Sequence, residues 1–268
     1  MSHKLRKIHF LFLHNGGQCP WHVWMIDQVR EAANTLNGTV RIVDITQDPE
    51  IAAKYQVFFP LMTIINDKLR IPAPISTNKL VKIVTEGVTE SQTISKPFRP
   101  PGTAKKVSPL TVENIIDTCR LCNYDTVQAH RAKQEWAART KGAIQDEFLG
   151  FASYEGKKLL GAVEFLPASL VPYPLPDKSP TIAFITCIYS TEDSKLDYRG
   201  QVLEHLIEYL KTQGYKKVQV IAGRRTAYPN GPVSLFFGNG FKEVVKIDSI
   251  ILKTGKEELV LMEKGLQG

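Results

Sequence analysis

The 268-residue sequence lacks several features that mark membrane and secreted proteins. No apolar run approaches the roughly 18 residues of a membrane-spanning helix, so we expect no transmembrane segment. The first 13 residues combine basic residues with a short apolar run, but no small-residue cleavage site follows, which favours a buried strand over a signal peptide. The four cysteines form no regular framework, as expected for a protein of the reducing cytoplasm.

A one-sided charge is absent from most of the chain. The formal net charge is +7, but residues 108–268 carry 20 basic and 19 acidic residues, so the excess lies on residues 1–107. That excess forms no basic helix and is not interleaved with aromatic residues, the patterns typical of nucleic-acid binding. We therefore expect a solvated surface, with neither nucleic acid nor a membrane as a partner.

Prolines and basic residues gather in one segment. Residues 96–109 contain four prolines, four basic residues, no acidic residue and no apolar periodicity, which predicts a linker. The chain also exceeds the usual length of one domain. We predict a first domain at 1–88, a linker at 89–107 and a second domain at 108–268.

Strands and helices alternate before the linker. We expect strands at 7–13, 40–45, 61–65 and 68–71, and helices at 20–35, 49–55 and 78–86. This alternation predicts a small α/β sandwich.

The pattern after the linker predicts a mixed α/β domain. We expect helices at 111–119, 125–140, 200–213 and 232–237, and strands at 148–154, 158–166, 181–189, 217–222, 243–252 and 257–262. The helix at 200–213 is the clearest, because Leu203, Leu206, Ile207 and Leu210 recur at i, i+3, i+4 and i+7. Five prolines in residues 166–180 predict a semi-rigid loop.

Cys19 follows an expected strand and opens an expected helix. At such a position, unpaired backbone N–H groups and the positive end of the helix dipole stabilise a reactive thiolate. The run Cys19-Pro20-Trp21-His22, together with Phe59-Pro60 before the next strand, resembles the thioredoxin/glutaredoxin family. The resemblance implies a thioredoxin-like fold for residues 1–88, with a cis-proline beside the cysteine.

His22 stands where dithiol members of that family carry a second cysteine, which is needed to resolve a mixed disulfide. Dithiol exchange is therefore not expected. Three interpretations stay open: a fold kept for docking or substrate positioning, monothiol exchange by Cys19, and a metal site of Cys19, His22 and His14. The last lacks a fourth ligand at a recognisable spacing, so we expect no metal.

The loop at residues 195–200, Lys-Leu-Asp-Tyr-Arg-Gly, carries the best chemical signal of the second domain. It lies between an apolar strand and the amphipathic helix. A loop of backbone N–H groups that leads into a helix N-terminus binds anions, and small residues let phosphates approach the backbone. We therefore expect its amides to face a diphosphate.

Four segments in this order resemble the GNAT superfamily of N-acetyltransferases over residues 108–265. They are the strand at 184–189, the loop with its helix, the strand at 218–222 and the block at 233–241. The stretch 161–167, with Cys119 and Cys122, is similar to a branch of that superfamily fused to thioredoxin-like domains. The resemblance implies a GNAT-type domain that transfers an acetyl group from acetyl-CoA to an amine of a small molecule, protein or peptide.

The resemblance also implies which residues contact the co-substrate: Ile188, Tyr189, Ser190, Lys195, Tyr198, Arg199, Gly200, Gln201 and Phe236. Two of them depart from the family pattern. In the ungapped placement of the family loop Tyr198 replaces a glycine, whereas an alternative placement, which needs a deletion, takes residues 198–201 as the opening of the loop. Phe236 stands where many members carry a tyrosine that protonates the leaving thiolate. Lys195 and Arg199 are expected to offset the changed loop through charge-assisted contacts to phosphate oxygens.

Glu164 is the first candidate for the base that deprotonates the amine. Strand alternation places it on the same face as Ala162, near the expected entry of the amine. The alternative is a carboxylate on a solvated sheet edge or in a structural salt bridge. Glu192 and Asp193 compete as bases, because they follow the strand directly.

Two further functions remain open beside the N-acetyltransferase. A GNAT-type domain without turnover would bind coenzyme A or serve as a scaffold, and Cys19 alone would make a monothiol redox protein. Cys119 and Cys122 have metal-like spacing but no partner pair, so we expect them to be buried at a helix end.

Overall fold

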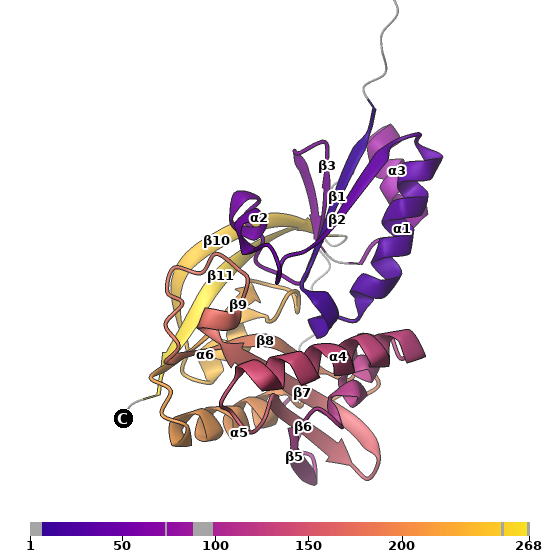
Figure 1. Ribbon diagram of the computed structural model, residues 1–268. Helices are drawn as coiled ribbons and strands as arrows, with labels where there is room; N and C mark the ends of the chain where they lie inside the picture. The colour runs from indigo at the N-terminus through magenta and orange to yellow at the C-terminus, as the bar shows by residue number, and fades with distance from the viewer. Residues whose placement is uncertain (1–6, 73, 88–98, 253–254, 267–268) are drawn as a thin grey trace, which may run out of the picture. The chain divides into compact units, whose positions relative to one another are not determined.

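The computed structural model describes residues 7–72, 74–87, 99–252 and 255–266. The chain divides into two compact units (Figure 1). Unit 1 comprises residues 1–93, 172–174 and 250–256, and unit 2 comprises residues 94–171, 175–249 and 257–268. In the described part of the chain, no helix combines the length and the apolar character that crossing a bilayer requires.

Unit 1 is built on a four-stranded sheet with the order β2-β1-β3-β4. The strands are β1 (His9–His14), β2 (Thr39–Asp44), β3 (Leu61–Ile65) and β4 (Leu69–Pro72). β1 and β2 are parallel, and the other neighbours are antiparallel. β1 and β3 are the two inner strands, and they are buried from Phe10 to His14 and from Leu61 to Ile65.

Helices α1 (Trp21–Thr35) and α3 (Thr77–Glu86) pack together on one face of this sheet (Figure 1). α1 buries Met25, Val29 and Ala32, which recur on one side of a 3.6-residue helix. The unit also contains a short 3₁₀ helix, η1 (Gly16–Gln18), and α2 (Pro49–Lys54). The strands and helices predicted for residues 7–86 are confirmed, with ends that shift by one or two residues.

Unit 2 is built on a seven-stranded sheet with the order β10-β11-β9-β8-β7-β6-β5. Its strands are β5 (Lys106–Leu110), β6 (Gly150–Glu155), β7 (Lys158–Pro167), β8 (Ile182–Ser190), β9 (Lys217–Gly223), β10 (Lys242–Leu252) and β11 (Gly255–Gly265). β8 and β9 are parallel, whereas β7 and β8 are antiparallel. A bulge interrupts the β7–β8 pairing, because Glu164 lies opposite Cys187 while Phe165 lies opposite Ile185.

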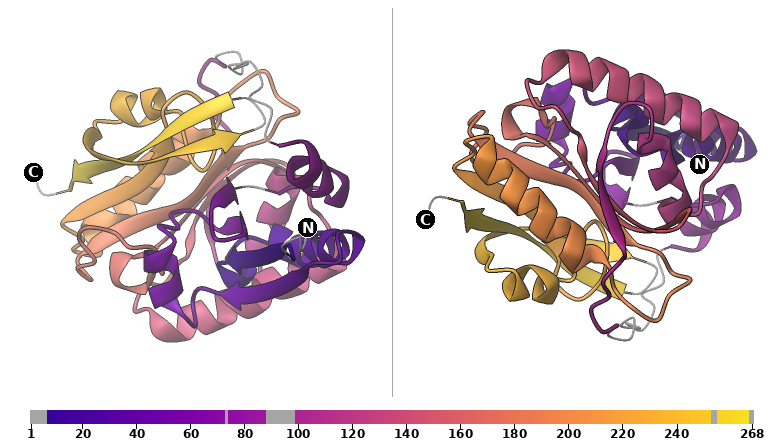
Figure 2. Two further views of the ribbon diagram at one scale, coloured as in Figure 1. Left: turned by 90° about the horizontal axis from the view of Figure 1, so that it is seen from above. Right: turned by 90° about the horizontal axis from the view of Figure 1, so that it is seen from below.

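Helices cover both faces of this sheet. Val163 and Phe165 of β7 join a core with α5 (Arg199–Thr212) and α6 (Val233–Gly238). Ala162, on the opposite face by alternation, packs near the 3₁₀ helix η2 (Ile115–Cys122), which contacts α4 (Val127–Ala143). The right view of Figure 2 shows α5 lying across its face of the sheet.

The predicted mixed α/β pattern of unit 2 is confirmed, but two segments differ. Residues 106–110, placed partly in the linker, form the edge strand β5, which tolerates Pro109 because an edge strand needs fewer ladder donors. The helix expected at 111–119 begins at Ile115 and is 3₁₀, since Asn114 bonds back to Thr111 N and Pro109 O. The 3₁₀ helix η3 (Ala168–Leu170) opens the proline-rich loop. The sequence Lys253-Thr254-Gly255-Lys256, between the strands expected at 243–252 and 257–262, predicts a turn, of which residues 253–254 lie outside the described residues.

Candidate functional site

The turn between β8 and α5 contains the loop predicted to cradle a diphosphate. Four consecutive amides of this turn donate to oxygens of the protein itself. Leu196 N donates to Ser194 Oγ (3.0 Å), Asp197 N to Pro100 O (2.9 Å), Tyr198 N to Ser190 Oγ (3.1 Å) and Arg199 N to Asp197 Oδ1 (3.1 Å). The expectation that these amides face an anion is therefore not met in this conformation.

The side chain of Arg199 is likewise fixed inside the turn. Its Nε and Nη2 donate to the Asp197 carboxylate at 2.6–3.1 Å, and its Nη1 donates to Gly231 O. Burial raises the pKa of Asp197, but the hydrogen bonds and charge of Arg199 outweigh this and hold it below its ordinary value. The phosphate contact predicted for Arg199 is thus replaced by an internal ion pair, whereas Lys195 is exposed.

Residues 99–104, which we call the strap, run along the edge of this turn. Gly102 N donates to Asp197 O (2.8 Å), and Pro101 forms a parallel bridge with Asp197. The Gln201 side chain bonds the backbone of Ala104 in both directions, at 2.8 and 3.1 Å. These residues were predicted as linker, but their hydrogen bonds make them part of unit 2.

Tyr198, the residue that replaces a loop glycine, points into the protein. Its ring is buried in a small cluster with Leu160 and Ala104. Gly161 makes room for it, because a Cβ at Gly161 would lie 3.0 Å from Tyr198 Cβ. Gly200, by contrast, has no heavy atom within 4 Å of the place where its Cβ would stand, so the start of α5 is open there.

The parallel strands β8 and β9 separate at their carboxyl ends. Their pairing ends at Ile185 and Val220, and beyond it the side-chain amide of Asn230 bridges the two strands. Its Oδ1 accepts from Ile188 N (2.9 Å) and its Nδ2 donates to Ile221 O (3.3 Å). The gap therefore has the width and the hydrogen-bonding groups to hold one amide.

Tyr189 and Ser190 lie at the same end of β8 and turn toward different neighbours. Tyr189 Oη donates to Pro229 O (2.7 Å), which anchors the loop that carries Asn230. Ser190 Oγ donates to Leu160 O (3.3 Å) and accepts from Tyr198 N. The structure thus brings the predicted residues of β8 and of the turn together around one strand end.

Glu164 lies in a buried ion pair, the structural alternative stated above. Lys133 Nζ on α4 bonds both of its carboxylate oxygens, at 2.8 and 2.7 Å, and both side chains are 2% exposed. Burial disfavours the Lys133 charge, but the Glu164 carboxylate outweighs this and raises the pKa of Lys133. An amine can reach Glu164 only if this pair opens. The base competitors Glu192 and Asp193 are exposed.

Two thiols border this ion pair. Cys187 lies opposite Glu164 in the β7–β8 pairing. Cys119 is completely buried, and desolvation raises its pKa to about 12, so it is a poor nucleophile. None of the four cysteines, all in the described part of the chain, forms a disulfide.

Phe236, which the resemblance predicts to contact the co-substrate, does not lie at the surface. It is completely buried in the core between α5 and α6, where its ring packs edge-on against Phe241 at 5.3 Å. The reason is the helical periodicity of α6, which places Val233 and Phe236 on the buried side, while Phe237 is 49% exposed. The predicted contact of Phe236 with the co-substrate is not available in this arrangement.

Cys19 of unit 1 is half-buried and lies between η1 and Pro20, the N-cap residue of α1, close to the helix start where the sequence predicted it. Next to it, the rings of His14 and His22 stack at 4.9 Å. His14 accepts from Gly16 N and His22 donates to Cys19 O. Burial lowers the pKa of both rings, that of His14 to about 4, with the His22 charge as the second cause.

Two further observations concern the expectations stated for Pro60 and for a metal. The cis peptide bonds among the described residues precede Pro229 and Pro232, so the expectation of a cis bond before Pro60 is wrong. The carbonyl oxygen of Pro60 accepts a hydrogen bond from Asn15 N. No group of three or more metal-ligating side chains has the arrangement of a metal site within residues 7–72, 74–87, 99–252 and 255–266.

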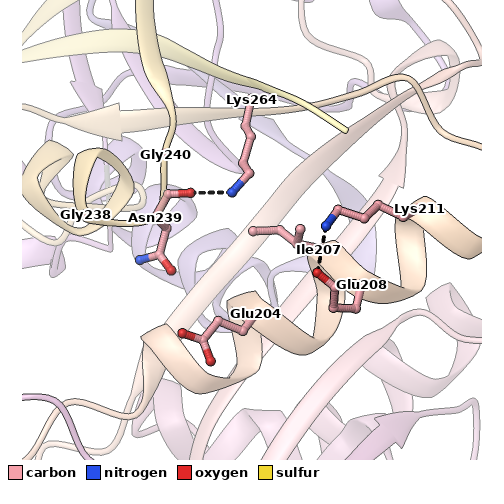
Figure 3. A pocket seen from close by; sticks show the side chains of 8 residues that line it. All are labelled: Glu204, Ile207, Glu208, Lys211, Gly238, Asn239, Gly240 and Lys264. Atoms are coloured by element: carbon pink, nitrogen blue, oxygen red, sulfur yellow. Dashed lines mark hydrogen bonds and ion pairs between the residues drawn. The ribbon is translucent and has the colours of Figure 1, made fainter. Parts of the chain in front are cut away.

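A shallow cavity of about 320 Å³ lies between α5, the end of α6 and β11, lined by Glu204, Ile207, Glu208, Lys211, Gly238, Asn239, Gly240 and Lys264 (Figure 3). Both of its lysines already have hydrogen-bond partners in the protein. Lys211 pairs with Glu208 at 2.8 Å, and Lys264 donates to Asn239 O at 2.7 Å. None of the predicted site residues lines this cavity, so we assign it no role in the site.

Sequence patterns missed three parts of the site: Lys133, Asn230 and the strap. For Lys133 a signal existed, because it falls on the buried side of α4 between Ala129 and Trp136, where a lone charge needs a partner. The run Pro229-Asn230-Gly231 marks a turn but says nothing about bridging two strands. The strap carries only linker-like composition.

The sequence matches no protein-family model and no curated protein. Solved structures similar to the chain include an N-acetyltransferase from Staphylococcus aureus Mu50 (15% identity, 60% of this chain and 98% of that chain, TM-score 0.46). A GNAT-family acetyltransferase from Streptococcus pneumoniae has 13% identity, covering 60% and 99%, with TM-score 0.45. The protein yncA from Salmonella typhimurium, solved with its cofactor acetyl-CoA, has 14% identity, covering 62% and 95%, with TM-score 0.47. Because these TM-scores lie below 0.5, the chemistry has to be inferred from the site itself.

Proposed function

We propose that unit 2 is an N-acetyltransferase that uses acetyl-CoA to acetylate an amine of a small molecule, protein or peptide. The observation that carries this proposal is the gap between β8 and β9, where the Asn230 amide spans Ile188 N and Ile221 O. The pantetheine arm of coenzyme A is extended and contains amides. An arm amide that replaced the Asn230 side chain would find the same donor and acceptor.

The reaction joins the amine nitrogen to the thioester carbonyl carbon and breaks the carbon–sulfur bond. The amine proton passes to a base, and the released thiolate takes up a proton from water, since Phe236 has no hydroxyl. Because the arm amide takes the Ile188 N–H, we assign the stabilisation of the oxyanion to the other backbone N–H groups at the end of β8, up to Ser190. Glu164 stays the first candidate base, and Lys133 must move away from its carboxylate before Glu164 can accept the amine proton. Glu192 and Asp193 are the exposed alternatives.

Calorimetric titration with acetyl-CoA, followed by thioester-consumption assays over a panel of amines, tests the proposal. We expect saturable binding, and consumption with at least one amine. In Asn230→Ala the gap is empty, so acetyl-CoA should bind at least about 5-fold tighter, because the two hydrogen bonds of the Asn230 side chain no longer compete. Asn239→Ala is the matched control, because its side chain bonds only Leu235 O at the end of α6. Absence of binding to both the native chain and Asn230→Ala would contradict the proposal.

A second candidate is a GNAT-type domain that has lost turnover and serves as a coenzyme A-binding or scaffold module. The four amides of residues 196–199 favour it, because all of them donate to the protein's own oxygens. Phe236 favours it as well, since it carries no hydroxyl to protonate a thiolate. Binding of acetyl-CoA without thioester consumption, for every amine tested, would support this candidate over the enzyme.

For unit 1 we propose a thioredoxin-like module that acts in docking or substrate positioning. The parallel pair β1–β2 and the position of Cys19 before α1 support this, although Pro60 lacks the expected cis bond. Cys19→Ser should leave acetyl transfer unchanged. If that variant instead abolished a thiol-exchange activity of the chain, the monothiol redox function would replace this proposal. A cytoplasmic location remains a prediction from the sequence.

A further inference from the structure

The strap occupies the edge of the β8–α5 turn that a diphosphate would need. Pro100 O of the strap accepts a hydrogen bond from Asp197 N (2.9 Å), and Gly102 N of the strap donates one to Asp197 O (2.8 Å). A pair of bonds on both sides of one residue is the pattern of a parallel strand pair, and Pro101 and Asp197 are bridge partners. Strap and anion therefore compete for the same backbone edge.

Side chains hold the strap at three points around the turn. Gln201, in the first turn of α5, bonds both backbone groups of Ala104. Arg99 Nη1 donates to Thr191 O (2.6 Å) and Ser194 O (3.3 Å), just after β8. The strap is thus fixed to the strand end, to the turn and to the helix start.

The packing of the strap depends on Gly102. A Cβ at this position would lie 2.8 Å from Leu196 Cβ and 2.8 Å from Tyr198 Cε1. Such approaches force a shift, and the Tyr198 ring cannot give way easily because it is buried. The strap contributes only Ala104 to the apolar cluster with Leu160 and Tyr198. Most of its attachment is hydrogen bonding, which water can replace when the strap leaves.

We propose that the strap is an autoinhibitory segment, which must leave the β8–α5 turn before the diphosphate of coenzyme A binds there. This inference rests on the proposed function of unit 2. Release frees the Asp197 amide and the Gln201 side chain, next to the open start of α5 at Gly200. The apparent affinity is then the intrinsic affinity multiplied by the fraction of molecules in which the strap is released.

Two variants that weaken the strap test the proposal by calorimetric titration with coenzyme A. Gly102→Ala introduces the clash with Leu196 and Tyr198, and Arg99→Ala removes the bonds to Thr191 and Ser194. We expect each to bind coenzyme A at least about 5-fold tighter than the native chain, because the clash or the loss of the two Arg99 bonds weakens the seated strap by about the worth of one hydrogen bond. Gly142→Ala is the matched control, because its added methyl meets nothing within 4 Å, and its affinity should be unchanged.

Hydrogen exchange provides a second readout that does not depend on the variants folding well. In the native chain, saturating coenzyme A should speed exchange at Gly102 N at least 10-fold, because this amide loses its partner when the strap leaves. Binding with unchanged exchange at Gly102 would overturn the inference but leave the proposed function intact. Weaker binding by folded Gly102→Ala and Arg99→Ala would overturn it as well. No binding by any variant would overturn both proposals.

Discussion

Unit 1 and unit 2 both place titratable side chains out of water, and they do so by different means. In unit 1, His14 and His22 stack at 4.9 Å, and burial lowers the pKa of both rings, so they are neutral. In unit 2, Lys133 and Glu164 stay charged and pair at 2.7 Å. A buried group avoids the cost of desolvation either by losing its charge or by pairing it.

This difference determines what disrupts each unit. Lowering the pH destabilises a unit that buries a neutral histidine, because the unfolded chain takes up a proton that the folded state does not. A buried ion pair is vulnerable to the loss of one partner, because the remaining charge stays uncompensated. The predictions below separate the two cases, from the largest expected effect to the smallest.

Lys133→Met removes one partner of the buried pair and leaves Glu164 alone on its sheet face. The free energy of unfolding of unit 2 should fall by about 3–5 kcal/mol. Urea denaturation measures this, followed by Trp136 fluorescence in a chain where Trp21 and Trp24 are phenylalanine.

The double variant Lys133→Met with Glu164→Leu is the control for this prediction. It removes both charges and keeps similar volumes, so it should recover most of the loss. A double variant as unstable as the single one would mean that packing around the pair, rather than an unpaired charge, dominates.

Lowering the pH should destabilise unit 1 selectively. Above pH 6.5, His14 is neutral both folded and unfolded and contributes nothing. Between 6.5 and about 4 only the unfolded chain takes up the proton, so stability falls with pH, and the loss levels off below about 4. The total is roughly 3 kcal/mol. Denaturation at several pH values, read from Trp21 and Trp24 in a Trp136→Phe chain, measures it.

His14→Gln tests whether this histidine causes the pH dependence. The variant keeps an acceptor for Gly16 N but does not titrate, so the fall in the unfolding free energy of unit 1 between pH 6.5 and 4 should shrink to the part that His22 contributes, since burial also lowers the pKa of His22. A slope equal to that of the native chain would assign the dependence to other groups.

Asp197→Ala breaks the ion pair of the β8–α5 turn, which lies nearer to solvent than the Lys133 pair. At pH 7 it should cost about 1–3 kcal/mol, because Arg199 and its own backbone amide lose their acceptor. Folding lowers the pKa of Asp197. Its contribution to stability is therefore fully present when the pH is above the ordinary pKa of an aspartate, and it is lost as the pH falls through the lowered pKa of the folded state. Asp193→Ala, an exposed carboxylate in the same loop, should change stability by less than about 0.5 kcal/mol.

Alkylation should distinguish the thiols of the two units, and this prediction concerns their reactivity rather than the free energy of unfolding. Cys19 of unit 1 is half-buried, whereas Cys119 of unit 2 is completely buried with a pKa of about 12. With iodoacetamide at pH 8, mass spectrometry should find Cys19 modified more than about 100-fold faster. Equal rates at the two cysteines would show that unit 2 opens readily around η2.

Local patterns predicted the elements of this chain well, because periodicity depends on neighbours along the sequence. The spacing of Leu203, Leu206 and Leu210 located α5, and the alternation in β7 placed Glu164 on the face of Ala162. The loop before α5 was located in the same way. Its amides were expected to face outward, but two of their acceptors, Pro100 O and Ser190 Oγ, lie outside the loop, where local patterns could not place them.

By itself, the sequence determined the α/β character, the order of strands and helices, and the place where a helix follows a buried strand. Only the tertiary structure decided that Glu164 meets Lys133, that Asn230 bridges β8 and β9, and that the strap covers the turn. Periodicity shows which side of an element is buried, but it does not name the partner. That choice is made when elements distant in sequence pack together, because a buried polar group takes whichever donor or acceptor the packing brings within reach.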